Sequence, residues 1–257
     1  WGDHLTNTPR QIMILKALGL RIPDYGHFSL IVNKKGAPLS KRDGSFAICD
    51  LLEKGYLAIS IINYVARLGH TYKSDDWMSL NALAADFSLS SLSRSPAKFM
   101  TPQLDYWQKE TVSRLSSTDF STWLGSECLK PVPVDTLDAF LKMIRPNVLF
   151  PADARHWVAV CFTQPALSWD EAQKHLLIET GKSFFTALLL AYQHCGADAP
   201  ALLSMLKEST GLKGKALFIP MRIVLTGQAH GPELAKLLEL IKPQWVNARL
   251  NQALSLL

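Results

Sequence analysis

The sequence has little of what marks a membrane-embedded, zinc-stabilised or disulfide-stabilised protein. None of its apolar runs approaches the roughly 20 residues that a membrane-spanning helix needs. No basic stretch followed by an apolar one stands near the first residue, so we expect no secretory signal peptide. Its four cysteines form no C-x-x-C pair, which argues against a zinc site and a disulfide framework. We therefore expect a cytoplasmic protein with reduced thiols, no metal site and no membrane partner.

The composition is that of a globular protein with a sizeable core. The chain has 257 residues, of which 48% are hydrophobic and 19% are charged, enough for two domains. It begins with Trp1 rather than Met, so we expect it to be part of a longer protein. The net charge is +5, and up to Leu115 the sequence has 14 lysines and arginines against 10 acids. This excess suits an anionic partner such as nucleic acid, although many proteins of this charge have no such partner.

Helix signals dominate the chain. Thr8-Pro9 and Thr101-Pro102 each combine an N-cap residue with proline at the first helical position, and predict helices to about Leu18 and Leu115. Phe28 to Val32 is the best strand candidate. From Ser116 onward nearly every segment reads as a short helix. The predicted fold is mainly α, with a small mixed α/β region followed by an all-helical cage or bundle.

Two finer expectations concern individual helices. In the first helix, Ile12, Leu15 and Leu18 recur at helical spacing, which predicts a stripe facing the core. In the carboxy-terminal half, Ser168 and Glu171 have the S-x-x-E spacing of a capping box and predict a helix start.

The segment Gly36 to Ser45 is the most informative stretch for function. Two glycines let the chain turn at both ends, and Pro38 removes a backbone donor, so neither a helix interior nor an inner strand fits. Ser40, Lys41 and Arg42 place a hydroxyl and two cations in consecutive positions, which suits a phosphate chain. A solvated basic turn remains the alternative on composition alone.

The same stretch resembles a known signature. Pro38-Leu39-Ser40-Lys41-Arg42 is similar to the KMSKS motif of class I aminoacyl-tRNA synthetases, in the LSKR form of bacterial glutamyl-tRNA synthetases. Three further patches resemble that family in the same order along the chain. They are Gly2 to Gln11, the group Gly55-Tyr56-Leu57, Asn63-Tyr64 and Leu68-Gly69, and the segment from Gly211 to Leu234.

The resemblance implies an ATP site around the motif. Lys41 would be the catalytic residue, its ammonium stabilising charge on the leaving pyrophosphate. The residues implied in ATP binding are Pro38, Leu39, Ser40, Lys41, Arg42, Asp3 and His4. Asp43 departs from the histidine of many relatives, and the arginine that relatives place before the first glycine is absent. Helix-end capping for Asp3 and a surface position for His4 are the alternatives.

The resemblance also implies an anticodon-binding surface. Its residues would be Arg222, Gly231, Pro232, Leu234 and, as a weaker candidate, Arg145. Arginine can pair with a base edge or stack on it, and unpaired bases accept apolar packing. For Arg222, an internal salt bridge with Glu233 or Glu208 is the alternative, because its neighbours are apolar.

The function implied is that of part of a glutamyl-tRNA synthetase. Residues 1–115 would hold the end of the catalytic domain with the stem-contact region. Residues 116–257 would be the anticodon-binding domain, in lobes of about 116–167 and 168–257. No H-I-G-H tetrad occurs in the sequence, so we expect the isolated chain to be inactive.

The implied partners are tRNA(Glu), L-glutamate and ATP with Mg²⁺, and we expect a monomer. Two other classes stay open at this point: a non-catalytic tRNA-binding module, and a helical protein-interaction scaffold.

Overall fold

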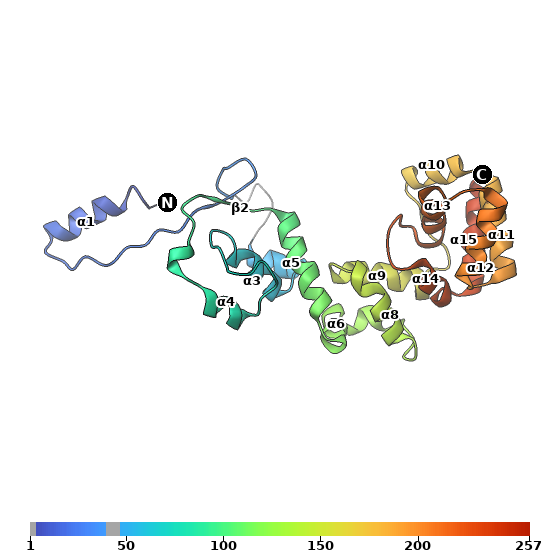
Figure 1. Cartoon of the computed structure of the whole chain (residues 1–257), viewed down its shortest axis with the longest axis horizontal. Coiled ribbons are helices and arrows are strands. Elements are labelled where there is room, and N and C mark those ends of the chain that lie inside the picture. Colours follow the sequence, from blue (N-terminus) through green and yellow to red (C-terminus); the bar gives the residue numbers. More distant parts are fainter. Residues whose placement is uncertain (1–3, 40–46) are drawn as a thin grey trace. The chain divides into compact units, whose positions relative to one another are not determined.

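The structure, a computed structural model, describes residues 4–39 and 47–257. The chain divides into two compact units, Trp1–Arg114 and Leu115–Leu257 (Figure 1). In the described ranges nearly all regular structure is helical, and both strands are only two residues long. The mainly α-helical class predicted from the sequence is confirmed.

Unit 1 combines five α-helices, one 3₁₀ turn and a minimal sheet in the part that the structure describes. In chain order they are α1 (Thr8–Ala17), β1 (Ile31–Val32), α2 (Ile48–Glu53), α3 (Ala58–Ala66), α4 (Leu80–Asp86), η2 (Leu89–Ser91), β2 (Ala97–Lys98) and α5 (Thr101–Arg114). The helix predicted from Thr101-Pro102 is confirmed as α5.

The predicted strand at Phe28 to Val32 is shorter than expected. Only Ile31 and Val32 form β1, which pairs in parallel with β2 in the register Ile31 to Ala97 and Val32 to Lys98. Phe28 is 65% exposed, so it lies outside this sheet and outside the core. This short pairing holds the chain just before the cationic segment, Gly36 to Ser45, against the residues that lead into α5.

The apolar stripe predicted for α1 does not form part of a core in this structure. α1 buries only Thr8, while Leu18 is 66% exposed and Ile12 and Leu15 are half-buried. The residues after α1, up to β1, run without helix or strand and are mostly exposed. Among the elements in residues 4–39 and 47–257, none packs closely on α1.

Buried polar side chains hold α3 against α5 and the α3–α4 connection. Asn63, fully buried, donates to the carbonyl of Met78 at 2.8 Å and accepts from its N–H at 3.0 Å. Gln108, also fully buried, accepts from the N–H of Leu57 at 3.0 Å and donates to the carbonyl of Gly55 at 3.2 Å. Because buried amides need partners, these bonds explain why the sequence has polar residues there.

All regular secondary structure in unit 2 is helical. Its elements are α6 (Ser117–Leu124), α7 (Ser126–Leu129), α8 (Leu137–Ile144), η3 (Arg145–Asn147), α9 (Pro151–Val158), η4 (Ala159–Thr163), α10 (Glu171–Thr180), α11 (Lys182–Cys195), α12 (Ala199–Thr210), α13 (Lys215–Thr226), α14 (Leu234–Leu240) and α15 (Pro243–Leu256).

The core of unit 2 lies where α11 packs against α12 and α15 (Figure 1). Phe185 and Leu188 of α11, Leu202 of α12 and Leu250 of α15 are all 0–1% exposed. Fully burying a side chain of this size contributes roughly 1.5–3 kcal/mol. The apolar helices are thus held together mainly by this shared interior.

The capping box predicted at Ser168 and Glu171 is wrong by two residues. Asp170 caps α10 by accepting from the N–H of Gln173 at 2.8 Å, and Gln173 accepts from the N–H of Asp170 at 3.1 Å. The D-x-x-Q pair forms the same reciprocal bonds as S-x-x-E, and Asp170 stands directly before the first helical residue.

Candidate functional site

The cationic segment is only partly described. Ser40, Lys41 and Arg42, together with Asp3, lie outside the described residues, so their predicted roles stay predictions. The approach to the segment is ordered: the N–H of Asn33 donates to the carbonyl of Ala37 at 2.7 Å, and Val32 bridges Pro38. Leu39, next along, is half-buried.

His4 lies in the turn before α1. Its ring is exposed, and its carbonyl accepts from the hydroxyl of Thr8 at 3.0 Å. The Nδ1 atom of His4 lies 3.5 Å from the side-chain amide of Asn7. This geometry suits a residue that closes the amino end of α1, and the ATP contact predicted for His4 stays a prediction.

A polar hollow in unit 2 brings together side chains from α9, η3 and the loop after α13. Its volume is about 370 Å³, within the roughly 300–1,000 Å³ of small-molecule sites. The residues that line it are Asn147, Ala152, Asp153, His156, Trp157, Gln228, His230 and Gly231. Of the residues predicted for anticodon binding, Gly231 is the one that lines it.

Gly231 lies directly against the indole ring of Trp157, on the buried side of α9. A Cβ atom at Gly231 would be 2.2 Å from Cη2 of Trp157 and 2.6 Å from Cζ2, closer than any side chain allows. The φ angle of Gly231 is +154°, a conformation that favours glycine. Only glycine therefore lets this loop close on the indole.

His156 lies in the wall of the hollow, with one of its ring nitrogens buried. Burial lowers the pKa of His156, and a backbone interaction with Thr226 and the charge of Asp153 oppose that effect. The Nε2 atom is buried and has no hydrogen-bond partner among the described residues. Asp153 itself is occupied, because it accepts from the N–H groups of Leu149 and Phe150 at 2.9 and 2.8 Å.

Arg222 fixes the loop that carries Gly231. Its guanidinium donates to the carbonyl of Pro232 at 2.9 Å, and burial lowers its pKa. The alternative of an internal salt bridge is wrong, since between the described side chains Arg222 forms no ion pair with Glu233 or Glu208. The carboxylate of Glu233 binds Lys236 at 3.2 Å instead.

The remaining residues predicted for anticodon binding lie near the hollow or in the core. Pro232 and Leu234 are buried, so their side chains support the loop rather than line the hollow. Arg145 donates to the carbonyl of Leu115 at 2.7 Å and lies 4.8 Å above the ring of Phe120. These two contacts fix η3 in place, and Asn147, the last residue of η3, lines the hollow.

Sequence reasoning missed most of the hollow. Asn147, His156, Trp157, Gln228 and His230 stand in three separate stretches, and none carries a motif by itself. The available signal was the polar pair Gln228 and His230 directly before Gly231, in a short loop after an apolar helix.

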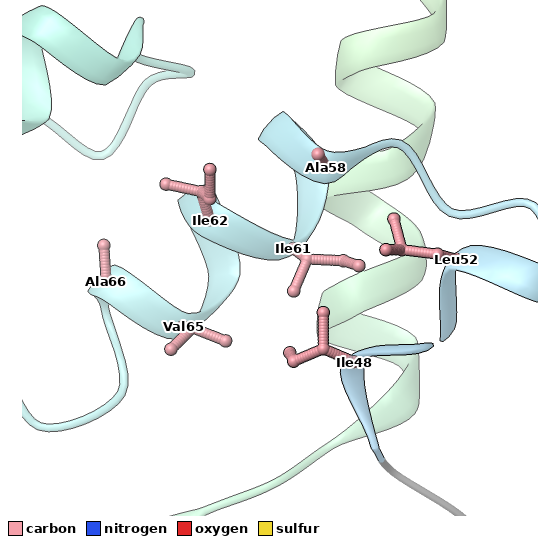
Figure 2. A pocket seen from close by; sticks show the side chains of 7 residues that line it. All are labelled: Ile48, Leu52, Ala58, Ile61, Ile62, Val65 and Ala66. Carbon is pink, nitrogen blue, oxygen red and sulfur yellow. The ribbon is translucent and has the colours of Figure 1, made fainter. Parts of the chain in front are cut away.

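A second hollow, in unit 1, is apolar. It has a volume of about 430 Å³ between α2 and α3, where Ile48 and Leu52 face Ile61 (Figure 2). Its lining is completed by Ala58, Ile62, Val65 and Ala66. Because none of these side chains donates or accepts a hydrogen bond, the groove has no side-chain group for a nucleotide or a metal ion.

The described residues hold neither a cluster of metal ligands nor a helix suited to a membrane. In residues 4–39 and 47–257, no three His, Cys, Asp or Glu side chains gather so that they could hold a metal ion. Within the same ranges, no helix combines the length and the apolar character that crossing a bilayer requires.

Comparison with protein families divides the chain into two matched regions. Residues 2–106 match the model of the tRNA synthetases class I (E and Q), catalytic domain. Residues 107–254 match the model of the anticodon binding domain, so the hollow at Gly231 lies in that region.

Curated relatives show the same likeness along almost the whole chain. A glutamate–tRNA ligase 2 of Coxiella burnetii is 50% identical over 251 residues, which are 98% of this chain and 54% of that protein. One from Nitrosococcus oceani is 45% identical over 249 residues, 97% of this chain and 52% of that protein. The chain thus spans about half the length of the curated relatives it matches.

A solved structure shows the same fold. The glutamate tRNA ligase of Elizabethkingia meningosepticum, in complex with its amino acid, superposes with a TM-score of 0.71 at 22% identity, over 98% of this chain and 55% of that one. Because the anticodon-binding model covers more than half of the chain and the catalytic-domain model most of the rest, the chain belongs to the class I tRNA synthetases of the E and Q group.

Proposed function

We propose that this chain is the tRNA-binding part of a glutamate–tRNA ligase, and that the hollow at Gly231 receives an unpaired base of the anticodon loop. The observation that carries this proposal is the hollow itself, which lies within the matched anticodon-binding region. The longer protein would attach glutamate to tRNA(Glu) through glutamyl-adenylate, with ATP as substrate.

The chemistry of the hollow suits a nucleobase edge. The amides of Asn147 and Gln228 each offer donors and an acceptor, and both residues are exposed. His230, an exposed residue, adds ring nitrogens on the same rim. Unpaired RNA bases are read by hydrogen bonds to their edges, so these groups can distinguish one base from another.

The charge on the loop side of the hollow favours RNA as well. Arg222 is a half-buried cation whose guanidinium binds a backbone carbonyl rather than a carboxylate. Its charge is not neutralised by Glu233 and can attract the phosphates of a bound loop.

Activation of glutamate depends, in this proposal, on Lys41. Its ammonium would stabilise negative charge on the pyrophosphate that leaves ATP, an effect worth roughly 3–4 kcal/mol for one well-placed donor. In the longer protein, Lys41→Ala should lower ATP–pyrophosphate exchange by about 10²–10³-fold and leave tRNA affinity nearly unchanged. The 257-residue chain alone should show no exchange.

The test of the hollow is a titration with an RNA hairpin that reproduces the anticodon arm of tRNA(Glu). Asn147→Ala and Gln228→Ala should each weaken binding by about 5–20-fold, because each removes a contact to a base edge. The matched control is Gln193→Ala, which removes an exposed glutamine of α11 outside the hollow.

Two results would contradict the proposal. One is an unchanged affinity of both hollow variants for the hairpin. The other is an equal loss in Gln193→Ala, which would mean that the effect is not specific to the hollow. Failure of the wild-type chain to bind any RNA would favour a protein-interaction scaffold.

A further inference from the structure

We propose that Arg249 is a positioning residue for the hollow at Gly231: it fixes the spacing of the two walls and thereby the selectivity for anticodon bases. The proposal rests on the proposed function, because the ligand concerned is the unpaired base. Arg249 belongs to α15 and does not itself line the hollow. It is fully buried, so it acts only through the residues that it binds.

The two main walls of the hollow come from separate stretches of the chain. One wall is α9, with Ala152, Asp153, His156 and Trp157. The other is the loop after α13, with Gln228, His230 and Gly231. The distance between these walls determines which base fits between them, so a contact that joins the walls controls selectivity.

One nitrogen of the guanidinium binds the end of the helical run that carries the first wall. Nη2 of Arg249 donates to the carbonyl of Val160 at 2.6 Å and to that of Gln164 at 2.5 Å. Val160 belongs to η4, a π-helical segment that follows α9 without a break, and stands four residues after His156. The last carbonyls of a helical run have no partner within it, and Arg249 supplies donors for two of them.

The other nitrogen binds the end of the helix that leads into the second wall. Nη1 of Arg249 donates to the carbonyl of Leu225 at 2.6 Å. The next residue, Thr226, is fully buried; its hydroxyl accepts from the N–H of Gln228 at 3.2 Å and donates to the carbonyl of Arg222 at 2.7 Å. Gln228, the first loop residue in the hollow, is therefore tied through Thr226 to the point where Arg249 binds.

Helix ends, rather than a carboxylate, hold the charge of Arg249. In the part of the chain that the structure describes, no Asp or Glu forms an ion pair with it. Burial lowers the pKa of Arg249 to about 10, which leaves it charged at neutral pH. The carboxy-terminal end of a helix carries partial negative charge, and the ends of η4 and α13 both meet this guanidinium.

The shape of the side chain explains why arginine occupies this position. Burying a charge is costly, so the core by itself favours an apolar residue here. Arginine has a planar fork with donors in fixed directions, whereas lysine is a point charge. A fork with one nitrogen on each helix end holds the two ends at a fixed separation, which neither an apolar residue nor lysine can do.

The experiment measures base selectivity in the 257-residue chain. The probes are two hairpins with one stem, one with the anticodon loop of tRNA(Glu) and one with its three anticodon bases replaced. Arg249→Lys keeps the charge but not the fork, and should lower the ratio of the two affinities by about 3–10-fold. Affinity for the hairpin with replaced bases comes mainly from phosphates and should stay within about twofold of the wild type.

A matched variant separates positioning from a general loss of stability. Leu202→Ala empties a fully buried site on α12 that is in neither wall, so it destabilises unit 2 without removing a contact between the walls. Under conditions in which both variants are folded, Leu202→Ala should keep the affinity ratio of the wild type.

The indole of Trp157 gives a spectroscopic signal from the first wall. In chains labelled with 5-fluorotryptophan, the fluorine resonance of Trp157 is identified by its loss in Trp157→Phe. This resonance should shift or broaden in Arg249→Lys and keep its position in Leu202→Ala. A role of Arg249 confined to overall stability would leave it unchanged in both.

Hydrogen exchange in the wild type tests the same link without any variant, and so covers the case in which Arg249→Lys does not fold. The N–H of Gln164 donates to the carbonyl of Ala159 at 2.8 Å, and that of Gly227 to the carbonyl of Ile223 at 2.9 Å. These amides lie at the two helix ends that Arg249 joins. They should become exchangeable in one opening step, with the same dependence on denaturant.

Three results would overturn the inference. They are an unchanged affinity ratio in Arg249→Lys, an equal fall of the ratio in Leu202→Ala, and separate opening of the two amides in the wild type. Each of them can occur while the wild-type chain still prefers the anticodon hairpin, and then only the role of Arg249 is refuted. Equal binding of both hairpins by the wild type would refute the proposed function instead.

Discussion

The guanidinium of Arg222, on α13, donates to the carbonyl of Pro232 at 2.9 Å, directly after the glycine that lies on Trp157. Because the donor is a half-buried cation, this bond is stronger than a neutral one and fixes the loop on the helix. The position of the hollow therefore depends on a residue that does not itself line it.

Replacing Arg222 by alanine should loosen that loop. We expect Arg222→Ala to lower the free energy of unfolding by about 1–3 kcal/mol, since the carbonyl of Pro232 loses a charged donor. Binding of the anticodon-arm hairpin should weaken by at least about tenfold. Urea unfolding and an RNA titration measure the two effects. The control Arg155→Ala removes an exposed arginine of α9 and should change stability little; equal effects in both variants would refute the role of the bond.

Adding a methyl group to Gly231 should displace the loop from the indole of Trp157. Gly231→Ala combines an unfavourable φ with overlap onto the ring, so we expect a loss of about 2–4 kcal/mol in unfolding free energy and of hairpin binding. Gly227→Ala is the matched control, because Gly227 has a φ of +72° but open space around its Cβ position. That variant should lose only about 1 kcal/mol, from backbone strain. A Gly231→Ala chain as stable as Gly227→Ala would mean that the indole contact is unimportant.

Arg249 is a fully buried arginine that joins three elements of unit 2. It donates to the carbonyls of Leu225, Val160 and Gln164 at 2.5–2.6 Å, and burial lowers its pKa to about 10. Arg249→Met should cost about 3 kcal/mol or more, because three carbonyls, two of them buried, lose a charged donor. Lys207→Met, at an exposed site on α12, is the control. Thermal and urea unfolding report the difference, and a stable Arg249→Met chain would show that the carbonyls find other donors.

His156 should make stability depend on pH. Burial lowers its pKa in the folded chain below the ordinary 6.5, so the unfolded chain binds more protons just below that pH. The free energy of unfolding should therefore fall as the pH falls from about 6.5 towards the lower pKa of the folded state.

His156→Gln should remove this part of the pH dependence. The measurement is urea unfolding at several values between about pH 5 and 7.5, with His194→Gln, an exposed histidine of α11, as control. A slope that is the same in His156→Gln and the wild type would contradict the assignment.

The helices were the part of the fold that the sequence predicted well, because their ends carry local signals. Thr101-Pro102 marks the start of α5, and Gly181 and Gly211 lie where helices end, each with positive φ. Such signals depend only on residues a few positions apart, so a short stretch of sequence is enough to predict where a helix begins or ends.

The pairing of β1 with β2 had no such signal. A two-residue strand shows no alternation, and Ala97-Lys98 lies more than sixty residues after its partner. The predicted stripe of α1 failed for a related reason. Periodicity predicts which side chains share a face, but not whether the described chain supplies a surface to cover that face.

Residues of the candidate site were named from the sequence only where a motif resembles that of a known family. Gly231 was named through that resemblance and lines the hollow, while its anticodon contact stays a prediction. Asn147, His156 and Gln228 meet it only in the folded chain. These residues come from three stretches of sequence that carry no motif. Only the packing of α9 against the loop after α13 shows that they line one hollow. Conversely, Leu234, which the resemblance named as an anticodon-binding residue, lies in the core. Its apolar side chain alone is enough to predict that position.

The most direct measurement compares two hairpins with the same stem, one with the anticodon loop of tRNA(Glu) and one with its three anticodon bases replaced. The wild-type chain should bind the first at least about tenfold more tightly, and Asn147→Ala should reduce that ratio. Both affinities should fall as salt rises, because phosphate contacts are common to the two hairpins. Equal affinity of the wild-type chain for the two hairpins would contradict the assignment of an anticodon-reading hollow.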